Sequence, residues 1–257
     1  MMRPVFIKAV IGILLPALFS VLSNASAGTR SFSAEAIQSA PGMQTTRMNL
    51  YVSGDKSVRI EMSTPQGKIV QQYIASSGLM RVLYPDRKEY LEQPSPVPFV
   101  MPGAVVLNPC ESMPDTKCVK VGEESINGQE AIHWLVTRES PNRQPFRIEQ
   151  WLDKKRGVTL REQLPNGTSI NASMVGNEKI DGREAERWEV KMTTADGKTQ
   201  SGTRWYDIEL GITIREAFPN GSVRELQNII VKEPDANLFM LPKDYRKLDV
   251  PTQSQRK

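Results

Sequence analysis

The chain repeats itself at an offset of 54 residues, and this duplication constrains its fold more than any other feature. The block at about 121–167 recurs without a gap at about 175–221, so that Val121-Gly122 matches Val175-Gly176. Self-similarity of this length indicates repeated supersecondary units. Residues kept in both copies are interpreted as architecture. They include all four tryptophans, with Trp134 matching Trp188 and Trp151 matching Trp205.

Most of the chain after its first 27 residues has the period-two pattern of strands. Val58–Met62, Trp188–Met192 and Ile212–Arg215 alternate apolar with polar side chains, which is typical of half-buried antiparallel strands. Asn-Gly and Asp-Gly pairs between these runs supply the positive φ angles of tight hairpins. The sequence therefore predicts a meandering antiparallel sheet of about ten or more strands, with short helical turns near 235–239.

The N-terminal residues of the chain predict export. Residues 1–27 have a basic start, an apolar run over Ala9–Leu22 and an Ala25-Ser26-Ala27 cleavage site, as secretory signal peptides do. A retained N-terminal anchor is the alternative. We expect a periplasmic protein with one domain over 28–247, a flexible tail over 248–257 and no transmembrane segment in the mature chain.

Two cysteines, Cys110 and Cys118, are the only ones in the chain. In an exported protein such a pair most often forms one disulfide. The alternative, a metal site, needs more ligands than two cysteines and the lone His133 provide. The sequence thus predicts a structural disulfide and no metal.

Charge and motifs exclude several functions. Removing Arg3 and Lys8 with the signal lowers the formal charge from +4 to +2, and the charges alternate rather than form the basic stripe that nucleic-acid binding requires. The chain has no phosphate loop and no dinucleotide fingerprint, so we expect no cofactor.

Catalytic side chains are equally sparse. His133, the only histidine, has Arg187 as its counterpart in the second copy and alternates with the Trp134 series, which predicts a solvent-side strand residue. Glu162 and Glu216 each follow an arginine, and they are expected to pair with neighbouring strands. A carboxylate pair for glycoside hydrolysis is the weaker alternative. We therefore expect no enzyme.

The segment Pro94–Pro109 breaks the strand pattern, because it is apolar yet contains five prolines and so cannot form a central strand. It is either an ordinary loop packed on the core or a lid over a ligand cavity, with the disulfide pinning its far end. As a lid it would cover the sheet with an apolar set: Phe99, Val100, Met101, Val105, Val106 and Leu107.

The methionines indicate either an ordinary packed core or a face that binds an apolar ligand. Met48, Met62, Met80, Met174 and Met192 all fall in expected strands, and methionine adapts its shape to flexible apolar ligands. A single long sheet with almost no helix must cover its apolar face by curling. A curled sheet can leave a cavity for an acyl chain.

Three motifs, taken in order, resemble the LolA/LolB-like lipoprotein-carrier superfamily. They are the hairpin from Met48 to Met62, the stretch from Gly78 to Tyr90 with its Tyr84-Pro85 and Lys88 pattern, and the C-terminal half from Trp205 to Tyr245. The resemblance implies an all-β-dominated, open, curved antiparallel half-barrel, with a few short helices or loops covering the concave face. It also implies a cavity that binds lipid or lipoprotein acyl chains in the periplasm.

The function expected is that of a periplasmic lipid- or lipoprotein-binding carrier or chaperone. The alternative is a protein-interaction module without catalytic activity, such as an envelope-stress sensor or outer-membrane assembly factor, with an envelope protein as its partner. The expected ligand-binding residues of the cavity and lid are Met62, Met80, Val82, Phe99, Val100, Met101, Val105 and Leu107.

Overall fold

The computed structural model describes residues 29–95, 97–111, 113, 116–138 and 145–249. The expected signal peptide and most of the expected tail lie outside these residues. The described part contains no helix long and apolar enough to cross a membrane.

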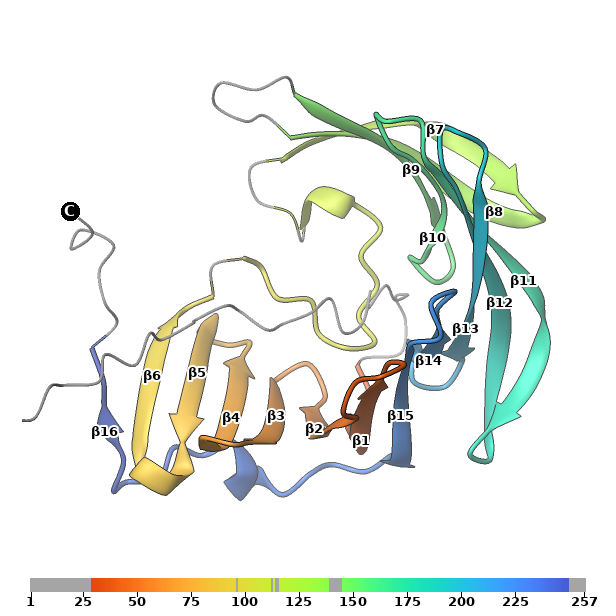
Figure 1. The fold of residues 1–257 in the computed structure, drawn as a ribbon. Helices are drawn as coiled ribbons and strands as arrows, with labels where there is room; N and C mark the ends of the chain where they lie inside the picture. The colour runs from red at the N-terminus through yellow and green to blue at the C-terminus, as the bar shows by residue number, and fades with distance from the viewer. Residues whose placement is uncertain (1–28, 96, 112, 114–115, 139–144, 250–257) are drawn as a thin grey trace, which may run out of the picture.

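One open sheet of sixteen strands makes up nearly the whole fold (Figure 1). Its first part contains β1 (Phe32–Ser39), β2 (Thr46–Ser53), β3 (Ser57–Thr64), β4 (Gly67–Ile74), β5 (Leu79–Tyr84) and β6 (Glu89–Pro94). Its second part contains β7 (Thr116–Ile126), β8 (Gln129–Arg138), β9 (Phe146–Asp153), β10 (Thr159–Gln163), β11 (Ser169–Ile180), β12 (Arg183–Thr193), β13 (Thr199–Asp207), β14 (Ile212–Ala217) and β15 (Val223–Ile230). The two-residue β16 (Arg246–Lys247) completes it.

The sheet is an open meander with two long-range pairings, β1 with β15 and β16 with β6. Its order is β16-β6-β5-β4-β3-β2-β1-β15-β14-β13-β12-β11-β10-β9-β8-β7, so β1 joins the first half to the second through β15. Sequential hairpins explain the other pairings, because antiparallel neighbours need only tight turns, whereas the two-residue β16 returns to pair in parallel with β6. The predicted sheet of serial hairpins is confirmed, with more strands than the minimum expected.

The duplicated blocks lie side by side in this one sheet. Strands β7–β10 and β11–β14 follow each other in the same order, and their first hairpins turn at equivalent residues, Asn127-Gly128 and Asp181-Gly182. Both turns place two consecutive residues at positive φ, as a type I′ turn requires.

The sheet bends strongly, and the bend creates an inner and an outer side. Figure 1 shows β1–β6 along the bottom and the second half curving upward beside them, with the chain after β6 running along the inner side of the bend towards a short 3-10 turn, η2 (Pro109–Glu111). Register shifts in pairings such as β9–β10 and β11–β12 are bulges that increase local bending. The expected open half-barrel, not closed into a barrel, is confirmed.

Two further 3-10 turns are η1 (Pro85–Arg87), between β5 and β6, and η3 (Ala236–Phe239), which packs on the outer side of the first half and not across the hollow. The Leu238 carbonyl accepts hydrogen bonds from Arg59 (2.7 Å) and Gln72 (2.9 Å). Asp235 caps the turn by accepting from the Asn237 amide, which explains why the short helical element predicted at 235–239 forms there. The hollow is covered by an irregular segment instead.

Candidate functional site

The strand register shows which side chains face the hollow, because residues opposed in an antiparallel ladder lie on the same face. One row across the first half consists of Leu91, Val82, Gln71, Ile60, Leu50 and Ala34. One row across the second half consists of Gln38, Arg224, Glu216, Arg204, Trp188 and Met174. Ala34 and Gln38 are four residues apart on β1, so both rows belong to one continuous face.

This inner face is apolar in the first half and mixed in the second. All five strand methionines of the sequence prediction lie on it, since Met48 pairs with Met62 and Met80 with Tyr73, while Met174 and Met192 share one side of β11–β12. The predicted cavity residues Met62, Met80 and Val82 therefore share one surface. Each is only half-buried, so the surface is incompletely covered.

The segment over residues 94–109 lies on this inner face. Phe99 stacks on Tyr73 with ring centroids 4.2 Å apart, and Met101 is buried in the main core cluster. The remaining predicted cover residues, Val100, Val105 and Leu107, are partly buried, and Val106 is buried. The structure thus places the segment over the sheet as both readings of it require.

A glycine sets the closest approach of this segment. Gly103 has φ of +83°, and a Cβ there would lie 2.7 Å from the Leu210 carbonyl oxygen. A side chain at this position would push the segment off the 207–211 turn.

Backbone bonds hold the segment weakly. Its start is held by the Ser95 amide, which donates to the Gly78 carbonyl (2.8 Å). Proline contributes no N–H, and five of the sixteen residues over 94–109 are prolines. The segment therefore rests on the sheet mainly through side chains.

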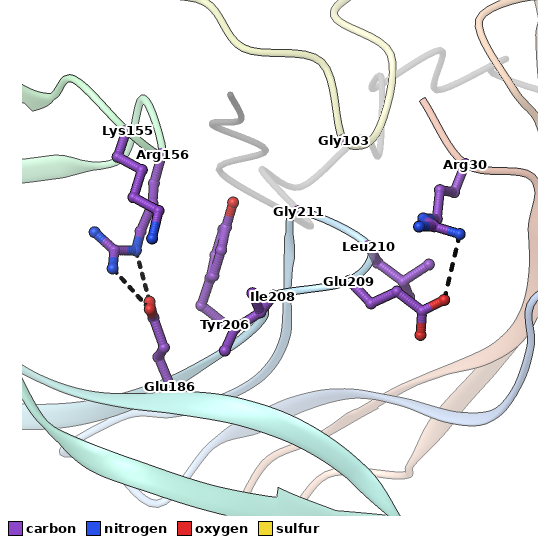
Figure 2. Close-up of a pocket in the computed structure, with 10 residues that line it drawn as sticks. All are labelled: Arg30, Gly103, Lys155, Arg156, Glu186, Tyr206, Ile208, Glu209, Leu210 and Gly211. Carbon is purple, nitrogen blue, oxygen red and sulfur yellow. Dashed lines mark hydrogen bonds and ion pairs between the residues drawn. The ribbon is translucent and has the colours of Figure 1, made fainter. Parts of the chain in front are cut away.

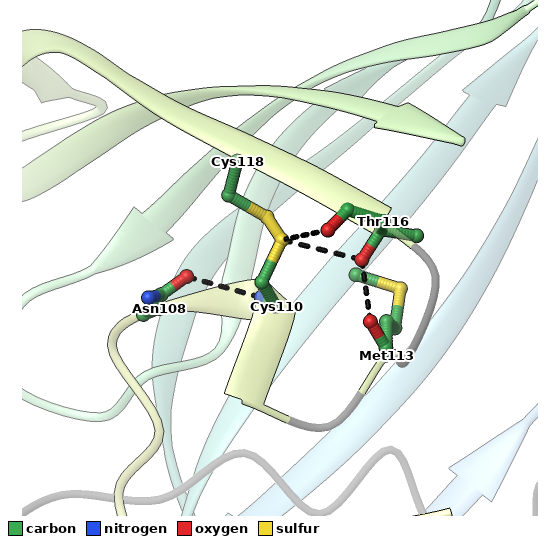
Figure 3. Close-up of a disulfide and its surroundings, with 5 residues drawn as sticks. All are labelled: Asn108, Cys110, Met113, Thr116 and Cys118. Atoms are coloured by element: carbon green, nitrogen blue, oxygen red, sulfur yellow. Dashed lines mark hydrogen bonds between the residues drawn. A yellow bond between two sulfur atoms is a disulfide. The ribbon is translucent and has the colours of Figure 1, made fainter. Parts of the chain in front are cut away.

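The far end is fixed covalently. Cys110 and Cys118 form the predicted disulfide, which ties η2 to β7 (Figure 3). The Asn108 side chain accepts from the Cys110 amide (3.0 Å), and the Thr116 hydroxyl donates to the Met113 carbonyl (2.5 Å). Among the described residues, no cluster of potential ligands could hold a metal.

Two apolar hollows border the segment on the inner face. A small one of about 30 Å³ lies between Phe99 and the first half, lined by Val58, Ile60, Gln71, Gln72, Tyr73 and Met80. A larger one of about 260 Å³ lies at the second half, lined by Val97, Met113, Thr116, Val136, Arg138, Phe146 and Ile148. The sequence did not point to the larger hollow, because the register of β7–β9 creates it.

A third, polar hollow of about 130 Å³ lies where the two repeats meet (Figure 2). Its wall is Arg156, which is 6% exposed. This guanidinium donates twice to Glu186 (2.6 and 2.7 Å) and once to Asp153 (2.7 Å). Burial lowers the pKa of Arg156, but the bond to Glu186 and the charge of Asp153 outweigh burial and raise it overall. The cation is therefore permanent and neutralises two buried carboxylates.

Tyr206 also lines this hollow, with its hydroxyl directed away from its strand in Figure 2. Burial raises the pKa of its phenol to about 12, with nearby carboxylates adding to the effect. A phenol with that pKa stays protonated near neutral pH, so it does not serve as a general base there.

His133 lies on the outer face, as the alternation predicts, but it is not a freely solvated side chain. It stacks on Trp151 at 4.1 Å and bonds to Glu149 at 3.0 Å. The prediction of a solvent-side residue is thus corrected: Trp151 shares that face and covers the imidazole.

The glutamates have structural roles. Glu124 accepts from the Trp151 indole (2.5 Å), and the equivalent Glu178 accepts from the Trp205 indole (2.9 Å). Glu216 pairs with Arg204 on the neighbouring strand (3.1 Å), as expected. Glu162 pairs with Gln150 across the sheet (3.3 Å) instead of with a cation. The repeated Trp–Glu pairs are architecture that the sequence marked without showing the partner.

The chain aligns over most of its length with several solved structures. One is a LolA superfamily protein from Nitrosomonas europaea, with 12% identity, a TM-score of 0.37, and 82% of this chain and 90% of that chain covered. Another is a putative outer membrane lipoprotein-sorting protein domain from Vibrio parahaemolyticus, with 11% identity, a TM-score of 0.31 and the same coverage. A third is a DUF1329 family protein from Desulfovibrio piger, with 14% identity, a TM-score of 0.30 and the same coverage.

No protein-family profile and no curated protein matches the chain.

Proposed function

We propose that the protein is a periplasmic carrier or chaperone that holds an acyl chain of a lipid or lipoprotein on the inner face of its sheet. The observation that carries the proposal is an apolar, half-buried surface on β3–β5 under a proline-rich segment. Met62, Met80 and Val82 provide the surface, and Phe99 covers it. The hollow beneath Phe99 is only about 30 Å³, so a chain enters when the segment moves aside.

The energetics favour such an exchange. Each buried CH₂ group contributes about 0.8 kcal/mol. An acyl chain of ordinary length therefore compensates for displacing the Phe99–Tyr73 stack, worth about 0.5–1.5 kcal/mol beyond its buried area, and for exposing the buried Met101, which costs about 1.5–3 kcal/mol. The segment keeps its far end through the disulfide. It therefore opens as a tethered cover, with Phe99, Val100, Met101, Val105 and Leu107 moving together.

Two measurements test this function. Lipid extraction of the purified protein followed by mass spectrometry should recover an acyl-chain lipid, and a fluorescent fatty acid should bind. The variant Met80→Glu should weaken that binding about tenfold or more, because it puts a charge on the apolar surface. Met43→Glu is the matched control, since Met43 is highly exposed in the loop before β2. Purified protein that contains no lipid and does not bind the fluorescent fatty acid would contradict the proposal.

One observation favours a second candidate, a protein-interaction module. The edge strand β7 has eleven residues, pairs on one side with β8, and exposes Val119 and Val121. Such an edge can add a strand from a partner protein. A stoichiometric protein captured from periplasm, lost on substitution of Val121 by Pro and accompanied by no lipid, supports this candidate over the carrier.

A further inference from the structure

The larger hollow on the inner face is lined by apolar side chains and one exposed arginine, Arg138. Three neighbouring strands contribute one row of side chains there: Thr116 on β7, Arg138 on β8 and Phe146 on β9. The next row consists of Cys118, Val136 and Ile148. The hollow thus has an apolar floor and one cation beside its opening.

One wall of the hollow is held by the disulfide, and another belongs to the proline-rich segment. The disulfide joins the floor row to η2, and Met113 follows η2 along the wall. The roof is Val97, which belongs to the proline-rich segment and is 46% exposed. Phe146, at the mouth, is 47% exposed although it is a large apolar residue.

The arginine at the mouth is not neutralised by the described residues. Arg204, on the same face, pairs with Glu216 at 3.1 Å, whereas no carboxylate in the described ranges forms an ion pair with Arg138. Its side chain is exposed. An exposed guanidinium beside an apolar cavity is complementary to a ligand with an apolar body and an anionic end.

The size of the hollow further limits which ligands can fit in it. Its volume is about 260 Å³, whereas pockets for drug-sized ligands measure about 300–1,000 Å³. A single acyl chain suits this space better than a phospholipid with two chains.

We propose that this hollow binds one acyl chain whose terminal carboxylate or phosphate pairs with Arg138. This inference rests on the proposed carrier function and specifies its ligand class. Val136 and Ile148 contact the chain, Val97 closes over it, and the guanidinium holds the anionic end at the mouth.

The test compares ligands that differ in one part only. Laurate has a chain and an anionic end, 1-dodecanol has the chain alone, and inorganic phosphate has the anion alone. Each competes with a bound fluorescent fatty acid on the full mature chain. Laurate should compete about fivefold better than 1-dodecanol, as expected for an ion pair near a protein surface, and phosphate alone should not compete.

Variants of the arginine separate its charge from its contribution to folding. Arg138→Gln should abolish the preference for laurate and leave 1-dodecanol binding unchanged, whereas Arg138→Lys should retain part of the preference. Arg147→Gln is the matched control, because Arg147 is an exposed arginine directly after Phe146 on the opposite face of β9. It should keep the full preference. Circular dichroism spectra and melting curves verify that each variant is folded.

The outcomes distinguish the two proposals. Equal competition by laurate and 1-dodecanol, unchanged in Arg138→Gln, overturns the assignment of Arg138 and leaves the carrier function standing. No binding of any acyl ligand by the wild type overturns the carrier function, and this inference with it.

Discussion

The substitution Arg156→Leu tests the packing between the two repeats, and the chain supplies its own design. Leu210 occupies the position equivalent to Arg156 in the second copy. There the equivalent aspartate, Asp207, pairs instead with Arg183, which matches Gln129 of the first copy. The first copy therefore neutralises this aspartate from the turn between β9 and β10, and the second copy neutralises it from the start of β12.

The expected loss of stability follows from the burial of the two carboxylates that pair with Arg156. Asp153 is 1% exposed and Glu186 is 5% exposed, and removing one partner of a buried ion pair costs about 3–5 kcal/mol. Asp153 keeps hydrogen bonds from the amides of residues 155 and 156, so most of the loss arises at Glu186. In a chain of this size such a loss lowers the melting temperature by about 6–20 °C.

Urea unfolding followed by tryptophan fluorescence measures the effect. The triple variant Gln129→Arg, Arg156→Leu, Glu186→Gln copies the arrangement of the second repeat and removes the orphaned charge, so it should recover most of the lost stability. Arg187→Leu, an exposed arginine on the same strand as Glu186, should change stability by less than about 0.5 kcal/mol. If Arg156→Leu lowered the free energy of unfolding by less than about 1 kcal/mol, the reasoning would be refuted, because loss of a buried cation leaves its carboxylate partners without a counter-charge.

Three further predictions concern the disulfide, the carboxyl group of Glu162 and the phenol of Tyr206. Replacing both Cys110 and Cys118 by Ser should lower the free energy of unfolding by about 2.5 kcal/mol, the loop-entropy value for a separation of eight residues; an unchanged urea midpoint would argue against it. Burial raises the pKa of Glu162 above its usual 4.5, so the folded state binds this proton more tightly than the unfolded chain, and stability falls as pH rises through that pKa. Glu162→Gln should therefore be more stable than the wild type at pH 7 and equal to it at about pH 3, and a variant less stable at pH 7 would contradict this. In an ultraviolet pH titration, substitution of Tyr206 by Phe should remove a phenol that ionises near pH 12, and loss of an earlier-titrating phenol would show that Tyr206 is not so buried.

Local patterns in the sequence predicted the elements of the fold well. The alternation in Val58–Met62 and the Asn127-Gly128 turn are properties of adjacent residues, and each specifies a strand or a hairpin without outside help. The shared face of Met62 and Met80 follows from the same alternation once the hairpins form in register. The disulfide was predicted from the cysteine count together with the expected export of the chain.

Contacts that depend on the curvature of the sheet could not be predicted in this way. The pairing of Arg156 with Glu186 joins the two repeats across thirty residues, and Glu124 reaches Trp151 from another strand. The position of η3 on the outer face depends on the hydrogen bonds that Arg59 and Gln72 donate to the Leu238 carbonyl, and these residues come together only in the folded sheet. The hollow beside Arg138 arises only where β7, β8 and β9 align with the roof residue Val97.

Photo-crosslinking with a fatty acid that carries a diazirine in its chain tests the central claim most directly. After irradiation and digestion, tandem mass spectrometry locates the labelled residues. Labels should fall on the inner face and its cover, in β3 and β5, in the segment over 97–107, and around Val136 and Ile148, and excess unlabelled fatty acid should suppress them. Labels spread over the outer face, near η3 or Trp151, and insensitive to competitor would contradict an acyl-chain site inside the curved sheet.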